Sequence, residues 1–292
     1  MPGVVLVNPH SGPDETSPSE IAARFPGSAV HEIDGHAVRR QVEEAIAGAT
    51  SPAFVAVAGG DGTIRCAAGV VAGTDLPLLA IPAGTRNHFA REVGTPTLDD
   101  ATAAADGEIV SIDVGEVNGE VFVNNANIGI YPRIVRDRTE HQKRFSKQTA
   151  TLVATWQQVR SIHKFTVTID EKGASYRAWM VFVGNGRYGS SLLDLGDRET
   201  LDDGILDVRI LRADGRLARL RVALALLSGR MERSPMTVFD EVRSITLSIA
   251  GRPKVDVALD GELVSMSTPL SFRCRAGALR VLVPRSASTA AS

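Results

Sequence analysis

A glycine-rich segment with one carboxylate, Gly59-Gly60-Asp61-Gly62-Thr63, has the residue types in this sequence that best suit phosphate chemistry. It follows an apolar, strand-like run at residues 54–58 and precedes a helical pattern at residues 64–71. Glycines at such a turn let the backbone approach a phosphate, and the first N–H groups of a helix attract anions. Asp61 would repel a phosphate unless it binds a cation or accepts a proton. The segment therefore predicts phosphate binding joined to metal-assisted or acid–base chemistry.

Two further polar turns also follow strand-like runs. Asn8-Pro9-His10-Ser11-Gly12 comes after residues 4–7, and Gly84-Thr85-Arg86-Asn87-His88 follows residues 78–81. In open α/β sheets, ligands bind outside the carboxyl ends of the parallel strands. Each turn alone is typical of an ordinary loop, but their order along the chain predicts that the three turns converge on one sheet edge.

The elements that must position these turns alternate between strand and helix. Strand-like runs at residues 4–7, 54–58, 78–81 and 108–114 are separated by helical patterns at 38–47, 64–71 and 98–106, which indicates a parallel sheet with helices on its faces. After about residue 115 the sequence changes to strands and turns, interrupted by helical patterns at residues 133–162 and 217–230. We expect an α/β domain at residues 1–115 and a mostly β, sandwich-like domain at 116–285. The last strand is expected to return to the first domain, before a frayed tail at 286–292.

Length and composition favour an ordinary two-domain globular protein. The chain has 292 residues, of which 43% are hydrophobic and 23% charged. A formal net charge of −2 argues against general binding to nucleic acid. Cys66 and Cys274 have no metal-ligand spacing, and no secretion signal is recognisable. Apolar runs fall well short of the roughly 20 residues that cross a bilayer. We therefore expect a cytoplasmic location, with any membrane contact peripheral.

The order of these motifs resembles that of the diacylglycerol kinase catalytic family, which includes bacterial lipid kinases and the related sphingosine and ceramide kinases. The likeness covers nearly the whole chain. Beyond the three turns it rests on Ile112-Asp113-Val114-Gly115, Asn124-Asn125, Ile128-Gly129, Val183-Gly184-Asn185-Gly186, the segment Leu201-Asp202-Asp203-Gly204-Ile205-Leu206-Asp207-Val208, and Leu259-Asp260-Gly261-Glu262.

This resemblance implies a fold like that of NAD and diacylglycerol kinases, with ATP and Mg²⁺ held between the two domains. The implied ATP-binding residues are Asn8, Ser11, Gly12, Gly59, Gly60, Asp61, Gly62, Thr63, Gly84, Thr85 and Asn87. A second magnesium site would use Asp203 with the main-chain oxygens of Thr200 and Ile205. Glu262 would be the general base, with Asp260 nearby.

Two interpretations of the carboxylates stay open. An alcohol gains about 10² to 10⁴ in rate from a carboxylate that accepts its proton, and both Glu262 and Asp61 suit that role. We favour magnesium binding for Asp61. Asp260-Gly261 is also a common hairpin turn, and Asp203 also suits a surface turn.

The chain departs from the family pattern at several positions. Arg86 and His88 stand where the family has Gly and Asp; Arg86 either binds a nucleotide phosphate or points into water, and His88 is interpreted as a helix-start residue. The glycine cluster after Tyr188 is reduced, at residues 189–194, which puts acceptor specificity in doubt.

A basic run at residues 133–164 is either a solvated helix face or a surface that attracts anionic headgroups. We expect phosphoryl transfer from ATP to diacylglycerol or a related lipid alcohol. The alternatives are an NAD kinase-like or other small-molecule kinase, and a regulator that binds nucleotide or lipid without turnover. A homodimer is left open.

Overall fold

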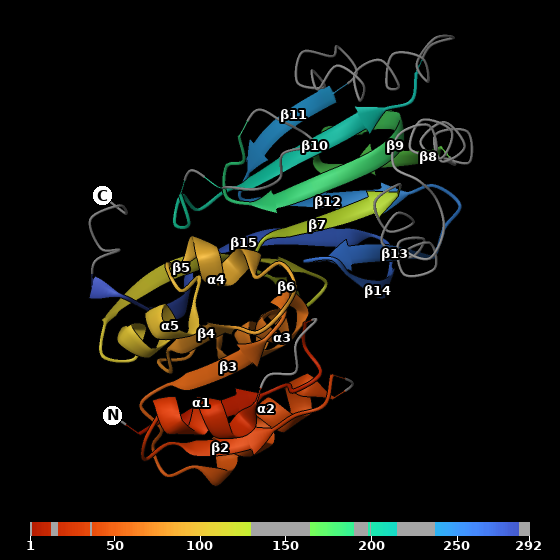
Figure 1. Cartoon of the computed structure of the whole chain (residues 1–292). Helices are drawn as coiled ribbons and strands as arrows, with labels where there is room; N and C mark the ends of the chain where they lie inside the picture. Colours follow the sequence, from red (N-terminus) through yellow and green to blue (C-terminus); the bar gives the residue numbers. More distant parts are fainter. Residues whose placement is uncertain are drawn as a thin grey trace, which may run out of the picture. The chain divides into compact units, whose positions relative to one another are not determined.

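The computed structural model describes residues 2–12, 17–35, 37–129, 164–189, 198, 200–214 and 237–285. The chain divides into two compact units (Figure 1). The first unit comprises Met1–Asn124, Thr200–Gly204 and Cys274–Ser292, and the second comprises Asn125–Glu199 and Ile205–Arg273. Each unit is therefore built from segments that are distant in the sequence.

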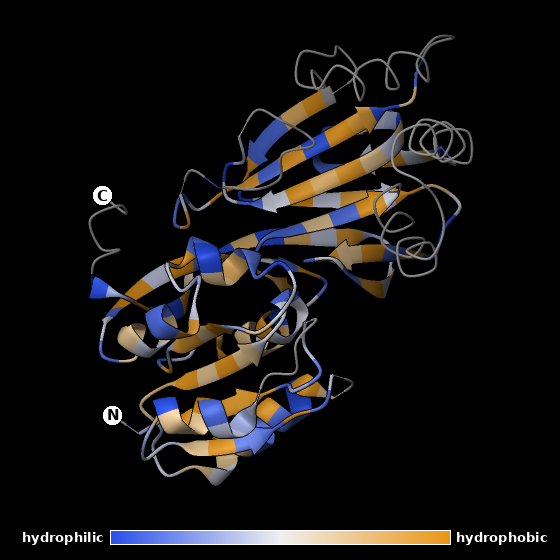
Figure 2. Cartoon of the chain, viewed as in Figure 1, coloured by the Kyte–Doolittle hydropathy of each residue, from blue (hydrophilic) through white to orange (hydrophobic). Residues whose placement is uncertain are grey.

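The first unit contains a parallel sheet in the order β2-β1-β3-β4-β15. The strands are β1 (Val4–Val7), β2 (Ala29–Glu32), β3 (Val55–Gly59), β4 (Leu78–Pro82) and the end of β15 (Leu270–Val283). Residues of β1, β3 and β4 are almost entirely buried, because helices cover both faces of a parallel sheet. Figure 2 shows β3 in hydrophobic colours, while hydrophilic residues are visible on α1 and α2.

Alternation along these strands divides the apolar side chains between two core clusters. Val4 and Leu6 pack in the same cluster as residues of α2 (Val38–Gly48), α3 (Asp61–Val71) and α4 (His88–Glu92). Val5 and Val7 pack with residues of α1 (Pro18–Arg24) and α5 (Leu98–Ala104). The first unit thus has three layers, with helices on both faces of the sheet, as the sequence predicts.

Strand β5 (Glu108–Val117) pairs with β15 and forms an antiparallel hairpin with β6 (Glu120–Phe122). This hairpin keeps residues 116–124 in the first unit, whereas we expected the boundary at residue 115. From Cys274 onward, β15 also belongs to the first unit, and Leu279, Val281 and Val283 join its core.

The second unit is built almost entirely of antiparallel strands. They are β7 (Asn125–Gly129), β8 (Phe165–Ile169), β9 (Ala174–Asn185), β10 (Leu206–Arg212), β11 (Thr237–Val242), β12 (Ser244–Ile249), β13 (Lys254–Leu259), β14 (Glu262–Ser267) and the start of β15. The long strand β9 pairs with β7, β8 and β10, so it is the centre of this sheet. A short 3₁₀ helix, η1 (Asp170–Lys172), joins β8 to β9. The mostly β character expected for this part of the chain is confirmed for the residues described.

The expected helices at residues 133–162 and 217–230 and the tail at 286–292 lie outside the described residues. Among the helices that the structure describes, none is long and apolar enough to cross a membrane.

Candidate functional site

The turn after β1 and the start of α3 are joined by a buried asparagine. Asn8 donates from Nδ2 to Thr63 Oγ1 (3.3 Å), and its Oδ1 accepts the His10 N–H (3.2 Å). The first intrahelical bond of α3 runs from Ile64 N–H to Gly60 O (3.1 Å), so the N–H groups of residues 61–63 precede the helical ladder. Such N–H groups are ready donors for an anion.

Close backbone approach brings the three predicted turns together. A Cβ at Gly12 would lie 2.7 Å from Ala83 O of the third turn, whereas a Cβ at Gly59 would lie 2.6 Å from Thr63 Cβ within its own turn. A Cβ at Gly84 would overlap Gly60 Cα. Gly12 also has a φ of +88°, which an L side chain rarely adopts. The sequence prediction that these turns converge at one sheet edge therefore agrees with the geometry of the first unit.

Asp61 and Asn87 shape this cluster of turns through their side chains. Asp61 is the first residue of α3, and its Oδ1 accepts the Phe89 N–H of α4 (3.1 Å). Asn87 has left-handed backbone angles, and its side chain accepts from Gly84 N–H (2.7 Å) and donates to Gly84 O (2.9 Å). Asn87 thus closes the turn that carries Thr85 and Arg86. His88 begins α4, as its interpretation as a helix-start residue requires.

Thr85 and Arg86 are exposed, while Ser11 is buried beside Asn8. The structure therefore brings together every predicted nucleotide-binding residue on the turns after β1, β3 and β4. The exposure of Arg86 is compatible with both of its proposed roles.

A buried carboxylate that we assigned no role holds the loop of the predicted second magnesium site. Asp113, on β5, is 2% exposed. Its Oδ2 accepts the Gly204 N–H (2.6 Å), its Oδ1 accepts the Gly277 N–H (2.7 Å), and its own N–H donates to Leu201 O (2.8 Å). The sequence contains one sign of this role: Asp113 lies between the apolar residues Ile112 and Val114, where a buried carboxylate needs hydrogen-bond partners.

Thr200 and Asp203 lie on the loop at 200–204 that Asp113 holds, and Ile205 follows as the first residue of the next segment. In the part of the chain that the structure describes, no group of three or more His, Cys, Asp or Glu residues is placed to hold a metal. The predicted site needs only one carboxylate with main-chain oxygens. Magnesium accepts such a set because it retains several waters.

The two remaining candidates lie in the second unit, at the turn between β13 and β14. Asp260 and Gly261 both have positive φ, +48° and +91°, so they form the primed two-residue turn that the Asp-Gly pair predicts. Asp260 Oδ1 also accepts the Asn125 N–H (2.9 Å). Glu262 is the exposed first residue of β14. Its role as a base stays a prediction.

Arg187, in the segment after β9, makes a paired contact with β11 of the same unit. It donates from Nε and Nη2 to the two carboxylate oxygens of Glu241 (3.0 and 2.8 Å). This hydrogen bonding holds the pKa of Glu241 below its usual range. Arg187 is therefore already bound to a partner.

Comparisons with known proteins agree with this architecture. The diacylglycerol kinase catalytic domain matches residues 2–117, and the YegS C-terminal NAD kinase beta sandwich-like domain matches residues 131–283. A Pseudomonas fluorescens protein named "Probable lipid kinase YegS-like" is 31% identical over 251 residues, which cover 84% of this chain and 82% of the relative. The chain belongs to the diacylglycerol kinase catalytic family.

Other members of the diacylglycerol kinase catalytic family are also similar to this chain. A Mycobacterium tuberculosis diacylglycerol kinase is 28% identical, over 86% of this chain and 83% of the relative. A crystal structure of a diacylglycerol kinase from Bacillus anthracis has a TM-score of 0.68 at 21% identity, covers 98% of each chain, and so shows a shared fold. The predicted fold class, an α/β domain followed by a β sandwich-like domain, is confirmed, and family membership supports a kinase activity.

Proposed function

We propose that the chain is an ATP- and Mg²⁺-dependent lipid kinase that phosphorylates a hydroxyl group of diacylglycerol or a related lipid alcohol. The observation that carries this proposal is the convergence of the glycine turns after β1, β3 and β4 beside the start of α3. The names of the relatives, lipid kinase and diacylglycerol kinase, support the acceptor class.

The proposed phosphate-binding groups are mostly backbone N–H groups, because phosphoryl transfer depends chiefly on positioning and charge neutralisation. Residues 61–63 contribute the first N–H groups of α3. The absent side chains at Gly12 and Gly84 let the turns approach one another, and Gly59 leaves room for Thr63 within the second turn. Asn8 keeps the first turn against Thr63, so the donors are arranged before nucleotide binds.

Asp61 suits a magnesium ligand better than a proton acceptor. Its Oδ1 already accepts the Phe89 N–H, which fixes the carboxylate, whereas Oδ2 has no hydrogen bond within the described residues. Bound magnesium would neutralise charge on the triphosphate. Asp203, with main-chain oxygens of Thr200 and Ile205, would hold a second ion. Glu262 would then accept the proton of the lipid hydroxyl, with Asp260 shaping the turn that carries it.

The lipid acceptor implies transient contact with the inner face of a membrane by an otherwise cytoplasmic protein. An assay with labelled ATP and the full chain tests the acceptor class. Diacylglycerol in mixed micelles, a sphingoid base and NAD should be compared at equal protein concentration. Transfer to diacylglycerol supports the proposal, and turnover of NAD alone overturns it. Binding of ATP without transfer to any acceptor would instead support a regulator.

Variants of the two acidic candidates test their separate roles. We expect Glu262→Gln to lower kcat by about 10² to 10⁴, since the amide cannot accept the proton. Asp61→Asn should raise the Mg²⁺ concentration that gives half-maximal rate. Glu43→Gln, an exposed position on α2, is the matched control and should leave both values unchanged. Unaltered transfer in both acidic variants would contradict the assigned mechanism.

A further inference from the structure

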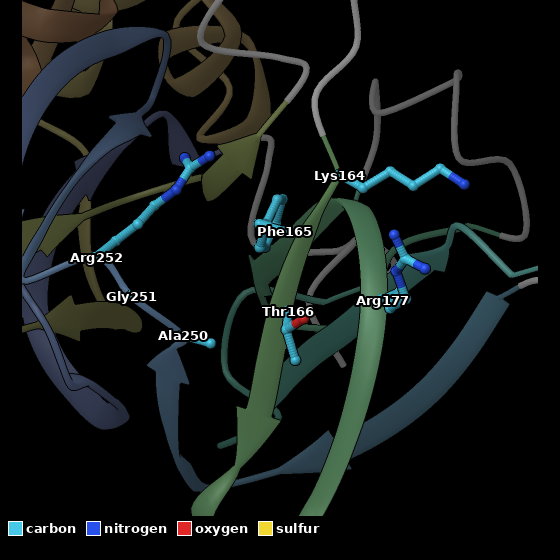
Figure 3. A pocket seen from close by; sticks show the side chains of 7 residues that line it. All are labelled: Lys164, Phe165, Thr166, Arg177, Ala250, Gly251 and Arg252. Atoms are coloured by element: carbon cyan, nitrogen blue, oxygen red, sulfur yellow. The ribbon is translucent and has the colours of Figure 1, made fainter.

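A hollow of about 300 Å³ lies in the second unit, and strand β13 separates the turn that lines it, at residues 250–252, from the turn that carries Glu262. Its lining comes from the start of β8, from β9 and from the turn after β12: Lys164, Phe165, Thr166, Arg177, Ala250, Gly251 and Arg252 (Figure 3). Three of the seven lining residues are cationic, and none is acidic.

Strand register explains why two of the lining residues, Thr166 and Arg177, lie on the same face of the sheet. Thr166 pairs with Arg177 across β8 and β9, so their side chains lie on one face. Phe165, one residue earlier, is buried in the opposite direction. The Ala250 N–H donates to Thr166 O (3.0 Å), which brings the turn at residues 250–252 alongside.

Lys164 is held in place by two contacts. Its Nζ donates to Ala213 O (3.0 Å) and lies 5.6 Å from the centroid of the Trp179 ring. Neither contact neutralises its charge. In Figure 3, Lys164 and Arg177 extend to one side of the hairpin, and Arg252 lies on the other side of Phe165. Cations therefore flank the hollow on two sides.

The positive charge of this hollow is not balanced by nearby carboxylates. Arg177 and Arg252 make no ion pair with any residue in the described ranges, whereas Arg187, Arg209 and Arg212 of the same unit are all paired. Asp214 is next to Ala213, whose carbonyl oxygen binds Lys164. However, Asp214 Oδ2 already accepts hydrogen bonds from Nε and Nη2 of Arg212 (2.9 and 2.7 Å).

The carboxylates of η1, Asp170 and Glu171, follow the end of β8, whereas the hollow is at its start; they accept from Ser248 Oγ and Thr246 N–H. On β11, Asp240 pairs with Lys172.

Several residues that line the hollow are exposed. Arg177, Arg252, Ala250 and Gly251 are exposed, and nothing lies within 4 Å of a Cβ built at Gly251. Two small residues, Ala250 and Gly251, thus lie beside the exposed side chains of Arg177 and Arg252. Because the chain as a whole has a formal net charge of −2, the positive charge here is local.

We propose that Lys164, Arg177 and Arg252 form a docking site for the phosphate of an anionic phospholipid headgroup. This inference rests on the proposed lipid kinase function, because it takes the membrane that carries the acceptor as the partner. Arginine donates two parallel hydrogen bonds to a phosphate, and the Thr166 hydroxyl is a further donor beside Arg177. The site would hold the enzyme at the anionic surface while the glycine turns bind nucleotide.

Sedimentation of the full chain with vesicles tests this docking site. Vesicles of phosphatidylcholine alone are compared with vesicles of phosphatidylcholine and phosphatidylglycerol. We expect the Arg177→Gln/Arg252→Gln variant to lose about five-fold in partitioning for each arginine on the anionic vesicles. The control, Arg24→Gln/Arg40→Gln, removes the same charge from two paired, exposed arginines of the first unit and should partition like the parent.

Equal losses in both double variants would overturn the proposal, because they would reflect net charge alone. Binding of inorganic phosphate at these arginines without any difference on vesicles would overturn it as well. Partitioning is measured without ATP, so its result is independent of the proposed function. Phosphorylation of a short-chain, water-soluble diacylglycerol, measured in parallel, tests that function separately and should be unaffected by the arginine changes.

Discussion

At the scale of single residues, the convergence of the three turns depends on glycines and on side chains that hydrogen-bond the backbone, such as Asn87. The sequence was sufficient to predict the three turns, because glycine and asparagine have few roles at the end of a buried strand. The sequence did not predict the role of Asp113, because its hydrogen-bond partners, Gly204 and Gly277, are distant from it along the chain. Only the folded chain shows that this carboxylate joins three segments.

Replacing Asp113 by asparagine should destabilise the first unit. An amide offers one acceptor and one donor group, so one of the two N–H groups would face another donor in a buried place. We expect a loss of about 2 kcal/mol in the free energy of unfolding, measured by urea denaturation. Asp106→Asn, at an exposed position after α5, is the matched control and should be neutral. A neutral Asp113→Asn would show that these hydrogen bonds contribute little.

Gly84→Ala should impair nucleotide use, because a Cβ there overlaps Gly60 Cα and separates two of the turns. We expect kcat/KM for ATP to fall by at least about ten-fold, as displacements of catalytic groups near 1 Å do. Gly48→Ala, where a Cβ meets nothing within 4 Å, is the control. Equal activity of the two variants would argue that the turns tolerate separation.

At the scale of elements, strongly apolar segments were predicted well and weakly apolar ones were missed. β1 has the expected bounds, because all four of its residues are apolar and buried. α1 and β2 were not predicted. α1 buries only Ile21, and β2 is an edge strand whose residues are mostly exposed, so neither carries a clear hydrophobic period.

Among the described helices of the first unit, the two N-caps that use a side-chain hydrogen bond, at α1 and α5, should differ in strength. Thr97 and Asp100 form a reciprocal capping box at α5, whereas Ser17 accepts a single, longer bond from Glu20 N–H (3.4 Å) at α1. Thr97→Ala should therefore cost about 1 kcal/mol of unfolding free energy, and Ser17→Ala less. Chemical denaturation of both variants measures the difference. A larger loss at Ser17 would contradict this reasoning.

At the scale of the whole molecule, neither unit is a continuous piece of chain. The backbone passes between the units after Asn124, Glu199, Gly204 and Arg273. The end of β15 pairs in parallel with β4 and adds Leu279 and Val281 to the core. We expected the last strand to return to the first domain, but its partner, β4, is distant in the sequence and only the folded chain shows this pairing.

A fragment of residues 1–124 should consequently fail to fold cooperatively, because β4 and the core cluster lose their β15 partner. Joining residues 274–285 to this fragment through a flexible linker should restore a cooperative thermal transition, measured by circular dichroism. The same linker followed by a scrambled 274–285 segment is the control. A cooperative transition for residues 1–124 alone would show that β15 is dispensable to the first unit.

Local sequence patterns were sufficient to predict the α/β character of the first part, the mostly β character of the second part and the three glycine turns. Each of these features depends on residue type and on contacts between near neighbours. The loop held by Asp113, the parallel pairing of β15 with β4 and the cationic hollow at Arg177 and Arg252 appeared only in the folded chain. They depend on strand register and on hydrogen bonds between distant segments, and no local period in a sequence carries that information.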